Sequence, residues 1–291
     1  MKNYLYAMGA ILCWASLPAA TGSGLDGLSI PQLMLFSFTS AAAVLYAQNT
    51  LKTSSFKLPL PEPKLSLLGV WGIFIYHGTY YLALDHTPLA EGAILTTTWS
   101  FWIVVFSSIL THRRLKITTT LTAIAGLAGA AMVVSAGKTI SFDLAFMKGY
   151  LLCLACGLIW SSFSVALGRT ATKKPGDPMP VFTLYAALLS AALYIATGPH
   201  PWPESKALAS AIYLGCVPLG LSFFFWNRAV SGGNLVVVGY LSYLTPPLAV
   251  LMVGVIHRQA VPFQVVLGMG VILGASLLGS LAEKKDHRES R

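Results

Sequence analysis

The sequence of 291 residues is 55% hydrophobic and only 10% charged, and its formal net charge is +9. Soluble domains carry roughly 25% charged residues, so too few polar side chains are present here to cover a water-facing globule. The positive charge does not indicate nucleic-acid binding, because the Lys and Arg residues lie in short loops between apolar runs and form no continuous basic face. The composition therefore indicates a protein embedded in a lipid bilayer.

Ten apolar runs are long enough to cross a membrane, since a bilayer core about 30 Å thick requires about 20 helical residues. They occupy residues 4–24, 31–51, 65–84, 88–111, 117–137, 149–168, 179–198, 207–227, 232–256 and 261–281. Within them, His77 and Glu91 are the only Asp, Glu, Lys, Arg or His residues. Because a helix satisfies its own backbone hydrogen bonds, we predict an all-α integral membrane protein with ten transmembrane helices.

The two halves of the chain resemble each other at a nearly constant shift. Trp14 matches Trp160 at a shift of 146, and Tyr80-Tyr81 matches Phe225-Trp226 at a shift of 145. An odd number of helices per unit forces the second unit to enter from the opposite face of the membrane. We therefore predict two inverted five-helix repeats, at 1–137 and 149–282, joined by a periplasmic linker at 138–148 and followed by a solvated, charged cytoplasmic tail at 283–291.

The distribution of basic residues predicts the orientation. If the N-terminus is cytoplasmic, the outside segments contain only four of the 19 Lys and Arg residues, namely Lys138, Lys148, Lys206 and Arg258. Cytoplasmic loops of membrane proteins are enriched in Lys and Arg. We therefore expect a multi-pass protein of a bacterial-type inner membrane, with the N- and C-termini in the cytoplasm.

Small residues in the fifth and tenth runs predict close helix contacts, because membrane helices associate where their backbones can approach. These residues are Gly126, Gly129, Ala130, Gly270 and Gly274. We interpret the two helices as scaffold and as a candidate dimer contact, so the protein is expected to be a monomer or a homodimer.

Several stretches resemble the EamA module. In the second half they are 214–220 (LGCVPLG), 225–229 (FWNRA) and 241–249 (LSYLTPPLA), and in the first half 81–84 (YLAL) and 87–90 (TPLA). EamA modules make up the drug/metabolite transporter superfamily, so the resemblance implies a carrier with two five-helix repeats. The aromatic stretches 76–81 (YHGTYY) and 97–102 (TTWSFW) resemble, more narrowly, the bacterial aromatic amino-acid exporters of the YddG type.

Two departures from the family pattern are visible. His112-Arg113 and His257-Arg258 stand where many members carry a Gly-Glu pair. Phe101-Trp102 stands in the middle of the fourth helix, where a proline is common. These differences bear on the substrate more than on membership of the superfamily.

Aromatic residues near the middle of their runs predict the substrate path. Trp and Tyr usually gather at membrane interfaces, and their polar edges would find no partner if they faced lipid. The candidate substrate-binding residues are Trp14, Tyr76, His77, Tyr80, Trp99, Trp160, Tyr240 and Ser242. For any single member, the alternative is ordinary core packing.

His77 and Glu91 are the two ionisable residues of the runs, and such residues are functional candidates. His77 is expected to sense protonation, to donate a hydrogen bond to substrate, or to form a structural hydrogen bond to a neighbouring helix. Glu91 is expected to be an interfacial carboxylate at a helix N-terminus, where the helix dipole favours it.

Prolines mark the candidate hinges. Proline removes a backbone donor and crowds the preceding turn, and carriers with inverted repeats place their sites beside interrupted helices. Pro246 and Pro247 give the clearest predicted break, and Pro18 and Pro218 give weaker ones. The alternative is a packed kink.

No metal or cofactor is expected, because Cys13, Cys153, Cys156 and Cys216 all lie in apolar runs and suit packing. We predict a carrier that exports aromatic and other apolar neutral amino acids by alternating access, with these amino acids and the bilayer as its partners. The lack of mid-membrane Asp, Glu, Lys and Arg favours facilitated over proton-coupled transport. The alternatives are a multidrug or nucleoside-type exporter and, outside transport, an intramembrane enzyme or a membrane scaffold.

Overall fold

The computed structural model describes residues 2–58, 60–113, 115–136, 138, 140–170, 176–257 and 261–289. Within these residues, ten helical stretches are long and apolar enough to cross a membrane, and they coincide with the ten predicted runs. The prediction of an all-α protein with ten spans is thus confirmed. Five of the basic residues in the charge count lie outside the described residues: Arg114, Lys173, Lys174, Arg258 and Arg291.

Several spans consist of more than one helical segment. The first five spans are α1 (Lys2–Ala15) with α2 (Leu17–Leu25), α3 (Ile30–Thr53), α4 (Pro63–Gly69) with η1 (Val70–Ile75) and α5 (Tyr76–Asp85), α6 (Leu89–Thr96) with α7 (Thr98–His112), and α8 (Ile117–Ser135). The last five are η2 (Leu144–Phe146) with α9 (Met147–Thr170), α10 (Met179–Ala196), α11 (Ser205–Leu214) with η4 (Gly215–Leu221) and α12 (Ser222–Gly232), α13 (Leu235–Ser242) with α14 (Thr245–His257), and α15 (Phe263–Glu289).

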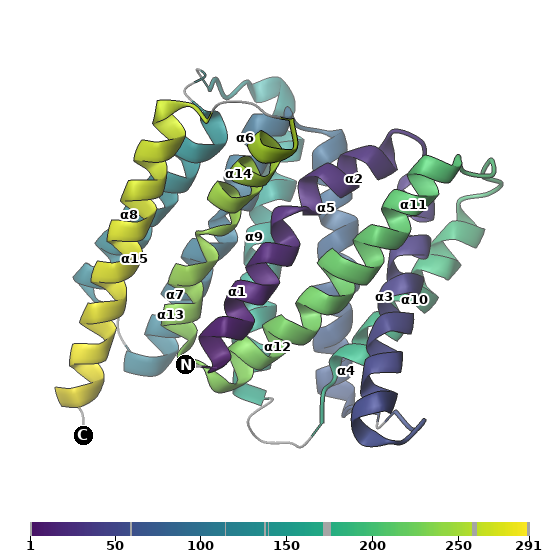
Figure 1. Cartoon of the computed structure of the whole chain (residues 1–291), viewed down its shortest axis with the longest axis horizontal. Coiled ribbons are helices and arrows are strands. Elements are labelled where there is room, and N and C mark those ends of the chain that lie inside the picture. The colour runs from purple at the N-terminus through teal and green to yellow at the C-terminus, as the bar shows by residue number, and fades with distance from the viewer. Residues whose placement is uncertain are drawn as a thin grey trace.

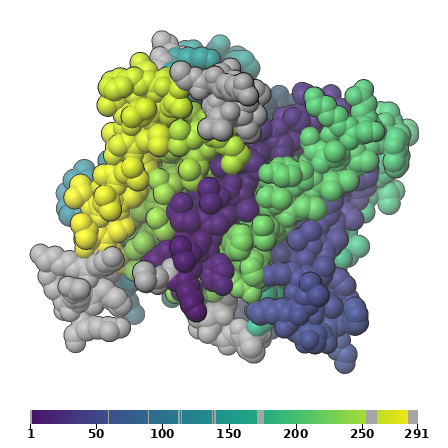
Figure 2. Space-filling model, in the orientation of Figure 1, coloured from purple at the N-terminus to yellow at the C-terminus, as the bar shows by residue number. Residues whose placement is uncertain are grey.

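The two halves pack with the reciprocal contacts of an internal two-fold arrangement. The first span contacts the eighth through α1 and α12, and the sixth contacts the third through α9 and α5. The corresponding second and seventh spans, α3 and α10, lie against each other, as do the fifth and tenth, α8 and α15. In Figures 1 and 2, α1 runs between the eighth span and the ninth on the viewed face.

The third and eighth spans share a distortion that supports this correspondence. Each contains a π-helical segment, η1 in the third span and η4 in the eighth, and the two segments begin 145 residues apart, at Val70 and Gly215. This is the shift found in the sequence repeat. In η4 the distortion includes Pro218, which cannot donate a backbone hydrogen bond, whereas η1 contains no proline.

The glycines of the fifth and tenth spans divide between two faces. A Cβ on Gly129 would lie 2.9 Å from the carbonyl oxygen of Gly268, so α8 and α15 pack backbone to backbone within the chain. A Cβ on Gly270 or Gly274, by contrast, would have no atom within 4 Å, so these two glycines face away from α8. The close contact at Gly129 of the fifth helix is therefore made within the chain.

The expectation of a solvated tail from residue 283 is wrong at its first residue. Helix α15 continues to Glu289, and Glu283 is only 4% exposed. The side chain of Asn234, which caps α13, donates a hydrogen bond to Glu283 Oε1 at 3.2 Å. The carboxylate is retained at this buried place because it meets a polar partner at the end of a neighbouring span.

Candidate functional site

Four tryptophans meet in the middle of the bundle, two from each half of the chain. Trp14 of α1 lies 5.7 Å from Trp99 of α7, 5.5 Å from Trp160 of α9 and 5.0 Å from Trp226 of α12, measured between ring centroids. Most of these pairs are edge-to-face or tilted, as the quadrupoles of aromatic rings favour. We call Trp14, Trp99, Trp160 and Trp226 the tryptophan cluster.

Two of the indoles are held by hydrogen bonds to other helices. Trp14 Nε1 donates to the carbonyl oxygen of Pro218 at 3.0 Å, and Trp226 Nε1 donates to Ser164 Oγ at 3.0 Å. The carbonyl oxygen of Pro218, in the distorted segment η4, therefore accepts a hydrogen bond from an aromatic residue of the other repeat. This bond ties the cluster to the π-helical segment.

Tyrosines of the third span extend the cluster on one side. The ring of Tyr76 lies 5.0 Å from that of Trp160, and Tyr80 is stacked on Tyr76 at 6.1 Å with an interplanar angle of 10°. Trp14 and Trp160 are buried, whereas Tyr76, Tyr80 and Trp99 are partly exposed. The predicted residues Trp14, Tyr76, Tyr80, Trp99 and Trp160 thus form one aromatic group with a buried base and a partly exposed face.

His77 lies behind this group. It is 2% exposed, and its Nδ1 lies 2.7 Å from the carbonyl oxygen of Ile73, within η1. The ring packs edge-on against Phe38 and also contacts Phe223. The hydrogen bond that the structure shows is made within the same span, and not to the neighbouring helix that the sequence analysis considered.

Tyr240 does not join the aromatic group. Its ring packs against α15, where a Cβ on Gly279 would lie 2.2 Å from it, and its hydroxyl bonds to Thr122 of α8. Its neighbour Tyr243 donates to the carbonyl oxygen of Ala123 at 2.8 Å. These tyrosines fix the ninth span to the fifth and tenth, because a hydroxyl buried among helices must find an acceptor.

Ser242 is connected to the tryptophan cluster through a hydrogen bond to the residue after Trp99. It is fully buried, and its hydroxyl donates to Ser100 Oγ at 2.8 Å, so α13 is joined to α7 one residue after Trp99. Glu91 lies in the first turn of α6, where it was expected.

The predicted breaks of the first and ninth spans occur just before their prolines. The ninth span is interrupted at Tyr243 and Leu244, so Pro246 and Pro247 lie in the first turn of α14. The first span is interrupted at Ser16, and Pro18 is the second residue of α2. Proline is tolerated in a first helical turn because its missing donor would have no intrahelical partner there. These prolines therefore begin helices and do not kink them from within.

A third interruption, in the fourth span, has no proline and escaped the sequence analysis. Helices α6 and α7 meet at Thr97, where Ser100 N donates to the carbonyl oxygen of Thr97 in a tighter, three-residue step. The side chains of Thr96, Thr97 and Thr98 each donate to a carbonyl three or four residues earlier. Such back-bonding bends helices, so the threonine triplet explains the break beside Trp99.

The interrupted spans diverge on one side of the cluster. The halves α7 and α13 contact each other, whereas α6 packs on α8 and α9 and α14 packs on α1 and α8. The bundle is therefore held together between the fourth and ninth spans on the side of α7 and α13.

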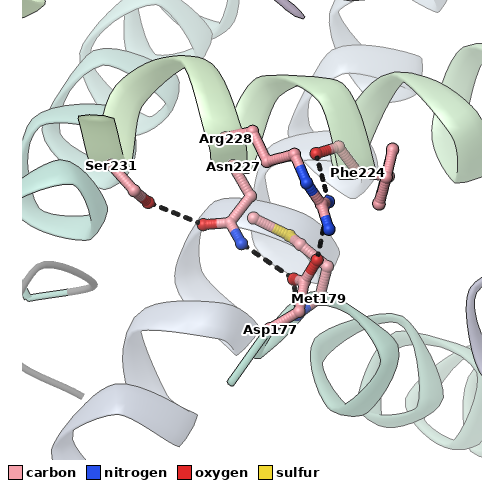
Figure 3. Close-up of polar contacts among 6 residues, drawn as sticks. All are labelled: Asp177, Met179, Phe224, Asn227, Arg228 and Ser231. Carbon is pink, nitrogen blue, oxygen red and sulfur yellow. Dashed lines mark hydrogen bonds and ion pairs between the residues drawn. The ribbon is translucent and has the colours of Figure 1, made fainter. Parts of the chain in front are cut away.

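A charged cluster lies near that closed side. Asp177, between α9 and α10, accepts hydrogen bonds from Asn227 Nδ2 at 2.8 Å and from the backbone N–H of Met179 at 3.1 Å, and it lies 3.3 Å from Arg228 Nη1 (Figure 3). The guanidinium of Arg228 lies over the ring of Phe224 at 3.4 Å. Burial raises the pKa of Asp177 above its ordinary value, although the N–H of Met179, Arg228 and Asn227 each oppose that shift.

Two parts of this site were missed from the sequence. Trp226 was matched to Tyr81 in the repeat but was not proposed as a site residue, and that match was the available signal. Asp177 had a weaker signal, namely that it is an acidic residue directly before an apolar run in a chain with only ten Asp and Glu residues. Among the described residues, no group of three or more His, Cys, Asp or Glu side chains could hold a metal ion.

Comparison with known families agrees with this architecture. The model of the EamA-like transporter family matches residues 1–135 and again 147–281. The chain belongs to this family. It is therefore a multi-pass membrane transporter and not an enzyme.

Similar proteins carry related descriptions. The aromatic amino acid exporter YddG of Ancylobacter novellus is 31% identical over 97% of this chain and 98% of its own. A probable terminal-alkyne amino-acid exporter of Streptantibioticus cattleyicolor is 22% identical over 83% of this chain and 81% of its own. One crystal structure superimposes with a TM-score of 0.86 at 31% identity, over 96% of this chain and 98% of the other.

Proposed function

We propose that this transporter is an alternating-access carrier that exports aromatic and other apolar neutral amino acids across a bacterial inner membrane. The observation that carries the proposal is the aromatic group around Trp14. The partly exposed faces of Tyr76, Tyr80 and Trp99 offer flat surfaces on which an aromatic or apolar side chain can stack.

The chemistry of the surroundings supports a neutral or zwitterionic substrate. The aromatic group itself contains no Asp, Glu, Lys or Arg side chain, and the histidine that contacts it, His77, is engaged by the carbonyl oxygen of Ile73. Phosphorylated substrates would need buried cations there. The names of the relatives from A. novellus and S. cattleyicolor point to amino-acid export as well.

The arrangement of the spans supports alternating access. Two similar five-helix units pack around the tryptophan cluster, and the first, fourth and ninth spans are interrupted at Ser16, Thr97 and Tyr243. Inverted-repeat carriers move one unit against the other around a site at such breaks. Because the aromatic group itself includes no carboxylate that could carry a proton, we propose facilitated movement down the substrate gradient.

The test is efflux from proteoliposomes that contain the purified protein and labelled phenylalanine, tryptophan, methionine or threonine. We expect release above that of protein-free liposomes, with no stimulation by an imposed pH gradient. Release of the labelled amino acids no faster than from protein-free liposomes would refute the substrate class. An efflux rate that depends on the imposed pH gradient would refute facilitated transport.

The site is tested by a matched pair of tryptophans. Trp99→Ala removes a ring of the aromatic group, whereas Trp202→Ala removes one that is 84% exposed in the connection before α11. We expect Trp99→Ala to reduce efflux at least tenfold, equivalent to about 1.4 kcal/mol, and Trp202→Ala to leave it unchanged. Equal effects would exclude the aromatic group as the binding site. In that case a multidrug or nucleoside-type exporter would be the next candidate to screen.

A further inference from the structure

A groove runs along the outer flank of the bundle between α7 and α9. Its volume is about 390 Å³, and α7 contributes Phe106, Ile109 and Leu110 to its lining. Ile109 and Leu110 are 41% and 47% exposed, so the groove opens on the surface that faces the acyl chains. Since water is absent from the bilayer core, an apolar groove at this place is filled by hydrocarbon.

The opposite wall of the groove is formed by one face of α9. Helix α9 contributes Ser162, Val165, Ala166 and Arg169, which are separated by three, four and seven residues and therefore lie on one face. From Ser162 to Arg169 the helix rises about 10 Å at 1.5 Å per residue. One leaflet of the bilayer core is about 15 Å thick. The groove thus has the length and direction of an acyl chain that descends from the membrane interface.

Among the described residues that line the groove, the charged one is Arg169, which lies at one end. Arg169 is in the last turn of α9 and is exposed, and Arg113, also exposed, ends α7 one turn beyond Ile109 and Leu110. A guanidinium has five N–H donors, so Arg169 can bind a phosphate together with a protein partner. Bidentate binding of phosphate is the geometry that arginine favours.

We propose that this groove binds one anionic phospholipid of the adjacent leaflet, with an acyl chain against Phe106, Leu110 and Val165 and the headgroup phosphate at Arg169. By the distribution of basic residues, that leaflet is the cytoplasmic one. The site is separate from the aromatic group, although α7 and α9 also carry Trp99 and Trp160.

A second groove provides an internal comparison. It lies between α3 and α10, has a volume of about 480 Å³ and is lined by residues such as Leu35, Ala42, Leu184 and Ala191. None of its lining residues is charged. It is expected to hold acyl chains with no preference among headgroups.

The experiment uses native mass spectrometry of the full chain after incorporation into bilayers with equal amounts of phosphatidylglycerol and phosphatidylcholine. We expect one retained phosphatidylglycerol per chain. Arg169→Gln should lower the preference for this lipid about fivefold, because one basic residue near an anionic membrane surface contributes about 1 kcal/mol. Arg169→Lys should retain most of the preference, and Lys57→Gln, at an exposed linker position, should leave it unchanged.

The acyl-chain part of the site is tested separately. Ala166→Phe places a ring in the groove and should reduce retention of the lipid, whereas Ala191→Phe fills the other groove and should not. Gel filtration and thermal unfolding serve as controls for the folding of each variant. Equal retention of the two lipids by the unmodified protein would overturn the proposal and indicate that the arginines only stabilise the helix ends. The proposal would also be overturned if Arg169→Gln kept the full preference for phosphatidylglycerol, or if Ala166→Phe retained this lipid as well as the unmodified protein does.

Discussion

Trp14 connects three features of the molecule through a single side chain. Its ring contacts the other members of the tryptophan cluster, its indole N–H reaches the carbonyl oxygen of Pro218, and it lies two residues before the interruption at Ser16. A ring at this position therefore couples the break in the first span to the distorted segment of the eighth.

The hydrogen bond of Trp14 can be removed while most of the ring volume is kept. In Trp14→Phe the carbonyl of Pro218 retains Ser222 Oγ as a partner but loses the indole. We expect a loss of about 1 kcal/mol in the free energy of unfolding, as for interhelical hydrogen bonds in membranes, together with slower amino-acid efflux. Thermal unfolding in detergent measures the first effect, and Trp202→Phe is the control for substitution of an exposed ring. An unchanged melting temperature would show that the bond contributes nothing.

Asp177 predicts a dependence of stability on pH. Its pKa is raised in the folded protein, so the protonated form contributes stability that is fully present below the ordinary pKa of the carboxyl and is lost as the pH rises through the raised value. The difference in melting temperature between the unmodified protein and Asp177→Asn should therefore favour the unmodified protein more at acidic pH than at neutral pH. A difference that is constant over this range, or that grows toward neutral pH, would contradict the raised pKa.

At the level of single elements, the π-helical segment η1 depends on the absence of a side chain at Gly72. A Cβ at this position would lie 2.0 Å from the ring of Phe163 of α9. Gly78, in α5 of the same span, has its nearest atom at 3.8 Å from a Cβ, on Met34. A methyl group would therefore clash at Gly72 but would fit at Gly78.

This pair predicts opposite results for the same substitution. Gly72→Ala should destabilise the protein by about 1–3 kcal/mol through overpacking. Gly78→Ala should be neutral or stabilising by up to about 1 kcal/mol, because alanine favours the helix. Unfolding in denaturant measures both. Similar losses in the two variants would mean that the third and sixth spans are not in close contact at η1.

Interruptions of the spans follow from local chemistry of different kinds. Helices α13 and α14 meet just before two prolines, whereas α6 and α7 meet at a run of threonines whose hydroxyls bond to preceding carbonyls. The two breaks nevertheless occur at corresponding positions of the repeats, at Thr97 and Tyr243. Proline is thus one way to produce the interruption, and its absence from the fourth span does not straighten that helix.

For the molecule as a whole, the ten spans require both ends of the chain to lie on one side of the membrane. In Figure 1 the start of α1 and the end of α15 lie at the same edge of the bundle. The excess of Lys and Arg in the connections on that side predicts that it is the cytoplasmic side.

The orientation can be measured with single cysteines on a background from which Cys13, Cys153, Cys156 and Cys216 have been removed. Lys206→Cys, at the start of α11, should react with a membrane-impermeant maleimide in intact cells, and Lys57→Cys, between α3 and α4, should react only after permeabilisation. The reverse pattern would invert the orientation, and labelling of both from one side would contradict the number of spans between them.

The sequence by itself determined the ten spans and the family. Both follow from local properties, because a run of about 20 apolar residues satisfies its backbone only as a helix, and the EamA-like stretches are contiguous in the chain. It also predicted five aromatic residues that the structure brings together, since mid-membrane Trp and Tyr side chains seek partners within the bundle. Their role in binding a substrate remains a proposal.

Only the tertiary structure decided which aromatic residues meet, where the spans are interrupted and which charges are paired. Tyr240 and Trp226 are both aromatic residues of long apolar runs, yet one packs against α8 and α15 and the other joins Trp14. Asp177 and Arg228 are 51 residues apart and become partners because α12 ends beside the start of α10. Such contacts depend on the rotation and approach of whole helices, which the packing of small and aromatic residues from distant spans establishes and which hydropathy along one chain does not encode.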